Sequence, residues 1–206
     1  MKKSLYSLIL SDEVVCGIDR LAEQMRTNRS RLIEEVLADF LHYQTPERTV
    51  YSIFCNLERL MSDLPFPITY NKFDNVFSLK RALAYKYRPT LKYDIALFPQ
   101  TSGTRAELRV NFRTQSRELE SKLLEFFKVF GAVERRFNQG RIEYVQEETR
   151  WIRVKYFDAD KTVEQMANEL SAFVKFFDAT LEKYISGEYS SFEQIQNDYK
   201  TFCHKG

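Results

Sequence analysis

Residues 4–43 read SLYSLILSDEVVCGIDRLAEQMRTNRSRLIEEVLADFLHY. The run over 4–10 is mostly apolar, with lysines before it and Ser11, Asp12 and Glu13 after it. Its even positions are Tyr6, Leu8 and Leu10, and its odd positions are Leu5, Ser7 and Ile9. An alternation with period two is typical of a β-strand whose two faces meet different surroundings. We therefore expect a strand over 4–10.

Two helices are predicted after this strand. Ser11 or Asp12 caps the first helix, because a small polar side chain can accept a hydrogen bond from a free N–H group. The apolar stripe of that helix has spacings of three and four: Val14, Ile18, Leu21 and Met25. Asn28 caps a second helix over about 29–43, which Thr45 and Pro46 end. Its broad apolar face consists of Leu32, Ile33, Val36, Leu37, Phe40 and Leu41.

The predicted strand has no partner within this short unit, and an isolated strand is not stable in water. A second copy of the chain would supply the partner. Two strands would then pair antiparallel about a two-fold axis, and four helices would bury the even face of the strands. The residues therefore predict a homodimer, with a tetramer as a further assembly.

The order of strand, helix, capped turn and second helix resembles the ribbon-helix-helix family of DNA-binding proteins, the Arc and MetJ type. The resemblance covers residues 2–44 and is carried by the strand, the turn at Ser11 and Asp12, Ile18, Leu21 and Ala22, and the segment 27–33. It implies that paired strands enter the major groove of double-stranded DNA and that the second helix holds a phosphate at its N-terminus. The groove-facing residues would be Lys2, Lys3, Leu5, Ser7 and Ile9. The phosphate-binding residues would be Thr27, Asn28, Arg29, Ser30 and Arg31.

Two departures from the family pattern matter. The family usually has polar side chains where Leu5, Ser7 and Ile9 stand, and these three discriminate weakly between bases because Leu and Ile can touch only thymine methyl groups. Arg26 stands where the family commonly has glycine, so it is expected in a left-handed conformation at a cost of roughly 1 kcal/mol. The unit carries six positive and seven negative side chains. We therefore expect low sequence specificity, or reliance on DNA shape and on the rest of the chain.

The remainder of the chain predicts an α+β domain. Residues 46–67 are expected to form a helical connector, with a helix over about 47–61, and residues 68–206 a domain of antiparallel strands and helices. Strands are expected within 76–112, although 76–86 could also form a helix. A helix over about 116–130 is expected to end at Gly131, and a hairpin over 141–156 and helices over 161–185 and 189–202 follow.

Cations and tyrosines alternate between residues 72 and 93. Lys80, Arg81, Lys86, Arg88 and Lys92 could form a secondary nucleic-acid surface. Two other interpretations stay open. These cations could be the solvated side of an antiparallel sheet, or they could face the acidic helices at the end of this chain or of a second one.

Composition limits the remaining possibilities. The chain has 206 residues, a formal net charge of +2 and three cysteines without regular spacing, so neither a disulfide framework nor a strongly charged field is expected. No signal peptide or membrane span is evident, and a cytoplasmic, bacterial-type transcriptional regulator without a cofactor or metal is expected. An interaction module that uses the N-terminal unit only to dimerise is the alternative. A metal-dependent nuclease built on Asp94, Glu107 and Arg109 is a remote one, and no enzyme is expected.

Overall fold

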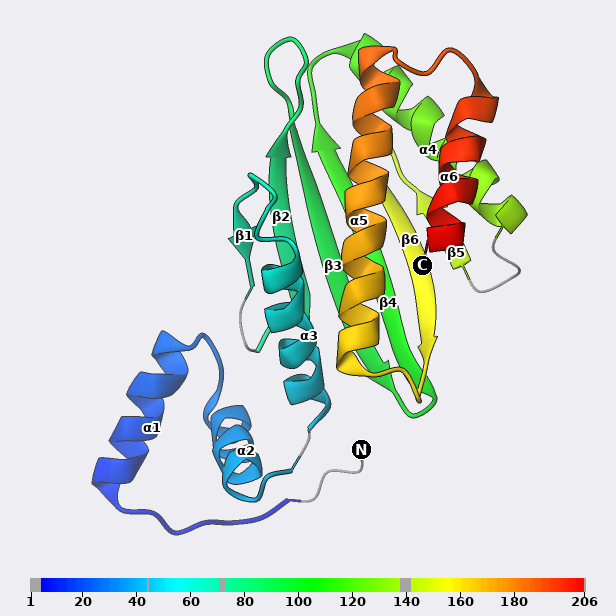
Figure 1. The fold of residues 1–206 in the computed structure, drawn as a ribbon. Coiled ribbons are helices and arrows are strands. Elements are labelled where there is room, and N and C mark those ends of the chain that lie inside the picture. Colours follow the sequence, from blue (N-terminus) through cyan, green and yellow to red (C-terminus); the bar gives the residue numbers. More distant parts are fainter. Residues whose placement is uncertain (1–4, 44, 71–72, 138–141, 206) are drawn as a thin grey trace.

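The computed structural model describes residues 5–43, 45–70, 73–137 and 142–205 and has an α+β fold (Figure 1). The helices of the described chain are α1 (Asp12–Gln24), α2 (Arg29–Phe40), α3 (Pro46–Leu60), α4 (Arg117–Phe137), α5 (Val163–Ser186) and α6 (Phe192–Lys205). Its strands are β1 (Ile68–Thr69), β2 (Val76–Ala82), β3 (Thr90–Gln100), β4 (Gly103–Arg113), β5 (Ile142–Gln146) and β6 (Arg150–Asp158). The strands predicted within 76–112 are confirmed, and 76–82 is a strand, not a helix. No helix in these ranges is both long enough and apolar enough to cross a membrane.

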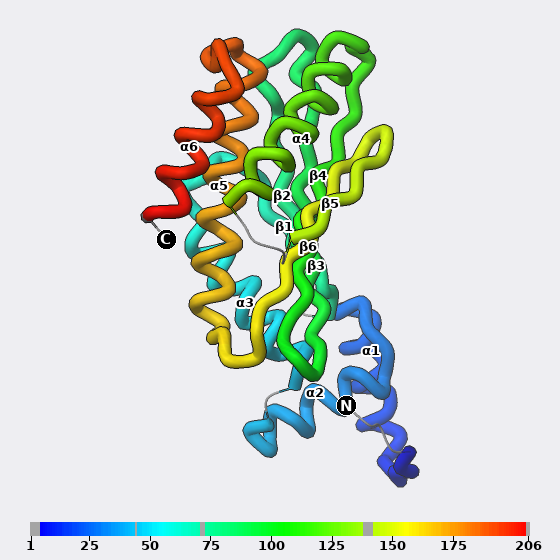
Figure 2. The backbone as a smooth tube through the Cα atoms, turned by 90° about the vertical axis from the view of Figure 1, so that its right-hand side faces the viewer, coloured from blue at the N-terminus to red at the C-terminus, as the bar shows by residue number. Residues whose placement is uncertain are grey.

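The strands form one antiparallel sheet in the order β1-β2-β3-β4-β6-β5. Strands β2, β3 and β4 are neighbours in sequence and in space, whereas α4 and β5 intervene between β4 and β6. Helices α3, α4, α5 and α6 cover one face of this sheet, and the opposite face carries no helix along its length (Figures 1 and 2). Helices α1 and α2 lie beyond one end of the sheet, away from the β2–β3 connection (Figure 1).

The hydrophobic core lies between the sheet and its helices. Side chains alternate along each strand, so Phe77 and Leu79 of β2 face the core together with Tyr93 of β3. Trp151 of β6 stacks on Phe177 of α5, with ring centroids 5.0 Å apart and planes 14° from parallel. Aromatic side chains of α4 and α5 surround this pair and fill the layer between sheet and helices.

Helix α3 is part of this core. Its side chains Val50, Ile53, Phe54 and Leu57 are buried in the same cluster as the sheet residues. The segment 46–67, expected to act as a connector, therefore contributes a core helix as well as a link. The apolar spacing predicted the helix but not the surface on which it packs.

Helix α4 continues through Gly131 to Phe137, so the predicted stop at Gly131 is wrong. A glycine inside a helix costs only about 1 kcal/mol relative to alanine, and packing can offset that cost. The ring of Tyr144 on β5 lies 3.8 Å from the position that a Cβ of Gly131 would take. The helix therefore passes close to the strand at this point.

Both N-terminal helices are present, but residues 5–10 form no strand in the single chain. The physical reason is that a strand requires a hydrogen-bonded neighbour, and no strand in the described part of the chain lies beside this segment. Asn28 caps α2 as predicted, because its side chain accepts a hydrogen bond from the backbone N–H of Arg31 at 2.9 Å. Arg26 has the expected left-handed conformation, with φ of 52°.

In the described chain, Arg48 and Phe73 attach the helix pair α1–α2 to the rest of the molecule. Arg48 of α3 donates hydrogen bonds to the carbonyl oxygens of Ala38 and Tyr43, at 3.3 and 3.1 Å, and pairs with Asp39. Phe73, which precedes β2, is buried against Ala22 of α1 and Leu32 of α2. The helix pair is thus joined to both α3 and the sheet.

Candidate nucleic-acid interface

An apolar groove of about 850 Å³ lies between residues 5–10, α1 and α2. Its lining includes Leu8, Leu10, Val15, Ile18, Ile33 and Leu37. Tyr6 also lines it, whereas Ser7 and Ile9 do not. Leu5 and all three even positions of the N-terminal segment therefore line the groove, although the segment forms no strand.

Exposed apolar side chains gather in this unit. Of the fifteen large hydrophobic side chains that are exposed in the described chain, twelve belong to residues 5–43. Leu5 and Ile9 are essentially fully exposed, at 99% and 102% of the reference area, and Phe40 is 83% exposed. Apolar surface concentrated in this way marks an interaction site, because scattered single residues are the normal pattern.

The structure describes only some of the residues that were predicted to face the DNA major groove. Leu5, Ser7 and Ile9 are exposed, and Leu5 also contributes to the lining of the apolar groove. Lys2 and Lys3 lie outside the described residues. Among the residues predicted to face the DNA major groove, those that the structure describes therefore offer one hydroxyl and two aliphatic side chains.

The residues predicted to hold phosphate come together at the start of α2. Arg29 donates to the carboxylate of Asp19 on α1, and this hydrogen bond holds the pKa of Asp19 below its ordinary value. Arg31 lies over the ring of Phe73, 5.7 Å from its centroid. Ser30 is exposed, and the hydroxyl of Thr27 is buried and has no hydrogen-bond partner among the described residues. Both guanidinium groups thus have partners within the chain.

The secondary basic surface predicted from the sequence requires one correction. Arg81 is 6% exposed and pairs with Asp178 and Glu182 of α5, so it faces the helices and not solvent. Arg81 shares its strand parity with Phe77 and Leu79, and this signal was available in the sequence. Its pairing matches the alternative in which the cations face the acidic helices at the end of the chain.

The other four predicted cations lie elsewhere. Lys80 and Lys92 stand directly opposite each other on β2 and β3, on the open face of the sheet. Lys86 and Arg88 are exposed in the β2–β3 connection. Tyr87 and Arg88 both have positive φ there, 67° and 44°.

The carboxylates considered for a nuclease share the open face but serve other partners. Asp94 accepts hydrogen bonds from Ser78 at 2.5 Å, Lys92 at 3.0 Å and Asn111 at 3.1 Å. Glu107 is held by Arg105 at 2.5 Å and by Arg109 at 2.6 Å. No group of three or more His, Cys, Asp or Glu in the described ranges is arranged to hold a metal ion. Chemically, this face presents cations around two paired acids.

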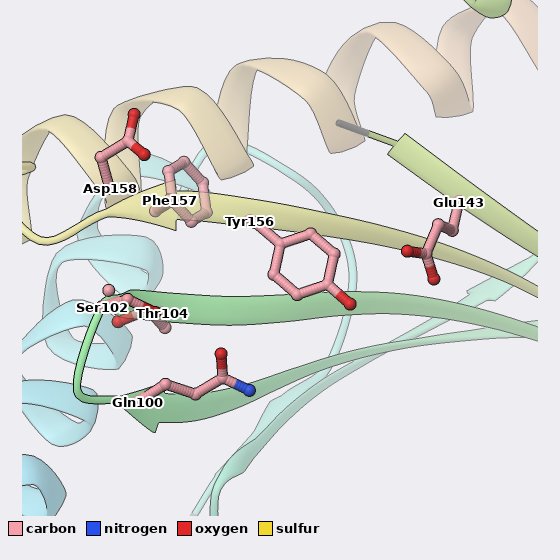
Figure 3. A pocket seen from close by; sticks show the side chains of 8 residues that line it. Gln100, Ser102, Thr104, Glu143, Tyr156, Phe157 and Asp158 are labelled. Carbon is pink, nitrogen blue, oxygen red and sulfur yellow. The ribbon is translucent and has the colours of Figure 1, made fainter. Parts of the chain in front are cut away.

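A small polar pocket of about 300 Å³ lies at the end of the sheet near the β3–β4 turn, and no motif or spacing in the sequence predicted it. Figure 3 shows Tyr156 between Glu143 and the turn residues Ser102 and Thr104. Gly103 has φ of 140°, and a Cβ there would overlap the carbonyl oxygen of Phe157 at 1.9 Å. The close approach of β4 and β6 therefore requires glycine at this position.

Comparisons of the chain with protein-family models, with curated proteins and with solved structures find no match.

Proposed function

We propose that this chain is a DNA-binding transcriptional regulator that acts as a homodimer through a ribbon-helix-helix unit over residues 2–44. The observation that carries the proposal is the unpaired segment 5–10, whose even side chains line an apolar groove against α1 and α2. Backbone N–H and C=O groups need hydrogen-bond partners when they are buried. A second copy would supply those partners and cover the groove in one step.

The pairing divides the segment into two functional faces. Tyr6, Leu8 and Leu10 would turn toward the four helices, where their apolar surface is buried. Ser7 and Ile9 would turn outward with Leu5 and the two lysines, at the surface that a ribbon presents to the major groove. A hydroxyl and aliphatic side chains read bases weakly, so the proposal includes low sequence specificity.

The start of α2 would contact the DNA backbone. Helix N-termini favour anions, because free N–H groups and the helix dipole both point toward them. Arg29 lies at this end, and a phosphate would compete with Asp19 for its guanidinium group. Arg31 and Ser30 flank the same turn.

A second candidate function is a protein-interaction module in which the unit only dimerises. The Arg29–Asp19 pair and the aliphatic residues at positions 5 and 9 favour it, because both reduce the attraction for DNA. The two candidates share the dimer and differ in DNA binding.

The test uses the full-length chain and two variants. Leu8→Asn removes an apolar side chain from the groove, and Val145→Asn makes the same kind of change at an exposed residue of β5 as a matched control. Burying a leucine is worth about 2 kcal/mol and a dimer buries two copies, so the dimer dissociation constant should rise at least about a hundredfold in Leu8→Asn alone. Analytical ultracentrifugation measures that constant.

DNA binding is measured on the same three proteins with random-sequence duplex DNA over a series of salt concentrations. Binding that weakens steeply with salt in the wild type and in Val145→Asn, and is lost with the dimer in Leu8→Asn, would support the proposal. If the wild type is a dimer that does not bind DNA at low salt, the DNA-binding proposal is overturned and the interaction module is supported. A monomeric wild type would overturn both candidates.

A further inference from the structure

The open face of the sheet carries a row of polar side chains that crosses four strands. Lys80 of β2 is paired in register with Lys92 of β3, Lys92 with Asn111 of β4, and Asn111 with Arg150 of β6. Neighbouring strands are about 4.8 Å apart, so the row is about 14 Å long. These four residues are called the cationic row below. Helices α3 to α6 lie on the other face of the sheet (Figures 1 and 2).

The two lysines of the cationic row are an unfavourable pair in the free protein. Like charges directly opposite each other on neighbouring strands destabilise a sheet. Lys92 is balanced by Asp94, at 2.8 Å, but Lys80 is exposed and has no ion pair in the described chain. An anion above the row would relieve the repulsion.

Hydrogen bonds hold the side chains of Asn111 and Arg150, the other two residues of the row, in place. Buried Asp94 accepts a hydrogen bond from the side-chain N–H of Asn111, and the side-chain oxygen of Asn111 accepts one from Nε of Arg150 at 2.8 Å. This chain of contacts fixes the guanidinium group of Arg150 through one edge. The carboxylate of Glu147 forms only a long ion pair with Arg150, 3.7 Å from Nη1 of the guanidinium group. The terminal nitrogens of Arg150 remain suitable for a phosphate, which arginine can bind with two parallel hydrogen bonds.

Further cations continue from the row toward the β2–β3 connection. Arg113 is exposed at the end of β4, in register with Thr90. Lys86 and Arg88 are exposed in the connection itself, and Tyr87 between them is 85% exposed. Two acids of the open face nearest the row are already engaged, since Asp94 balances Lys92 and Glu107 is shared by two arginines.

We propose that the cationic row binds the phosphate backbone of duplex DNA as a second contact surface of this chain. Charge complementarity supports a polyanion, and a long open row suits a repeating phosphate backbone better than a small ligand. The proposal rests on the proposed function in one respect, which is that the polyanion is the duplex DNA bound by the N-terminal unit. Backbone contacts of this kind contribute affinity without sequence readout.

The test compares two double variants of the full-length chain that lose the same charge. Lys80→Gln/Lys92→Gln removes both lysines of the row, and Lys128→Gln/Lys200→Gln removes exposed lysines of α4 and α6 on the helix-covered side. Each lost phosphate contact should reduce the slope of log affinity against log salt by about 0.9. For random-sequence duplex DNA, the row variant should therefore show a slope smaller by about 2 per protomer, and the control an unchanged slope.

The outcomes separate this inference from the proposed function. If Leu8→Asn abolishes DNA binding and the row variant keeps the wild-type slope, the proposed function stands and the cationic row is overturned. If Leu8→Asn binds as the wild type does but the row variant loses its slope, the row binds DNA and the N-terminal unit does not. Equal losses in the row variant and the control would indicate only a general charge effect, and would also overturn the row.

Discussion

Arg26 and His42 end the helices α1 and α2 in left-handed conformations, with φ of 52° and 54°. In both turns the N–H groups of the left-handed residue and of the residue after it donate to backbone carbonyl oxygens of the helix. Arg26 donates to Glu23 and Thr27 to Ala22 after α1, and His42 donates to Asp39 and Tyr43 to Ala38 after α2. This pattern is the Schellman motif, which usually places glycine at the left-handed position. Helix α5 uses that residue, Gly187, with φ of 79°.

Replacement of Arg26 by glycine should stabilise the protein. An L side chain in this conformation costs about 1 kcal/mol, and the added flexibility of glycine in the unfolded chain offsets part of the gain. We expect the free energy of unfolding to rise by about 0.5 kcal/mol in Arg26→Gly and to fall by about 1 kcal/mol in Gly187→Ala. Urea denaturation measures both. A loss of stability in Arg26→Gly would show that its side chain contributes more than its conformation costs.

Single residues also show where sequence reasoning reached its limit. The conformation of Arg26 and the cap at Asn28 could be predicted, because both depend on neighbours within a few positions of the chain. The burial of Arg81 depends on its ion pair with Asp178 of α5, which is nearly a hundred residues away in the sequence. The sequence near Arg81 does not show this partner. Long-range partners of this kind have no local signal apart from strand parity.

At the scale of elements, most helices and strands were predictable because their apolar residues repeat with a clear period. The failures have physical causes. A strand was expected over 4–10 from the alternation of apolar residues, but no strand of the described chain lies beside residues 5–10 to pair with them. Helix α4 continues through Gly131, which is buried and lies near Tyr144, because a single interior glycine lowers helix propensity by only about 1 kcal/mol. The open face of the sheet and the order of the strands depend on packing that no single segment encodes.

The joint between α2 and α3 gives a prediction at this scale. Arg48→Met should remove the hydrogen bonds to the carbonyl oxygens of Ala38 in α2 and of Tyr43 just beyond it, together with the ion pair to Asp39. Hydrogen bonds from a charged group contribute about 1.5–3 kcal/mol. We therefore expect amide hydrogen exchange in α1 and α2 to become at least tenfold faster, while the sheet keeps its protection.

The control for this joint is Arg59→Met on the same helix. Arg59 is exposed, and within the described chain its side chain donates a hydrogen bond of 3.2 Å to Asn56. Its exchange pattern should match that of the wild type. Unchanged exchange in Arg48→Met would mean that the contacts of Arg48 do not hold the helix pair in place.

At the scale of the whole molecule, buried tyrosines bind carboxylates that anchor the helices to the sheet. Tyr93 donates to Asp178 at 2.6 Å, and Tyr144 and Tyr199 donate to Glu134 at 2.6 and 2.9 Å. Burial, together with the adjacent carboxylates, raises the pKa of all three hydroxyls. Burial also raises the pKa of Tyr184 to about 12.

These tyrosines should set the alkaline limit of stability. The unfolded chain loses their protons near pH 10 while the folded chain keeps them, so the folded state binds more protons above that pH. The stabilisation is fully present below about pH 10 and declines as the pH rises further. We expect the ultraviolet absorbance of tyrosinate from these residues to appear together with unfolding, which circular dichroism follows in parallel.

Tyr199→Phe tests the assignment, because it removes one of these ionisable groups. Stability should decline less steeply with pH in this variant, although it starts lower because Glu134 loses a hydrogen bond. Ionisation of the buried tyrosines near pH 10 in a protein that is still folded would contradict the expectation.

The attachment of the helix pair has a mechanical consequence. A unit tethered at one point could swivel freely, but Arg48 and Phe73 hold α1–α2 from two elements that are distant in sequence. Two fixed points leave rotation about the line between them as the easiest motion. A torque on the helix pair would therefore be transmitted to α3 and to the start of β2 at the same time. The sheet would then move together with the N-terminal helices under such a load.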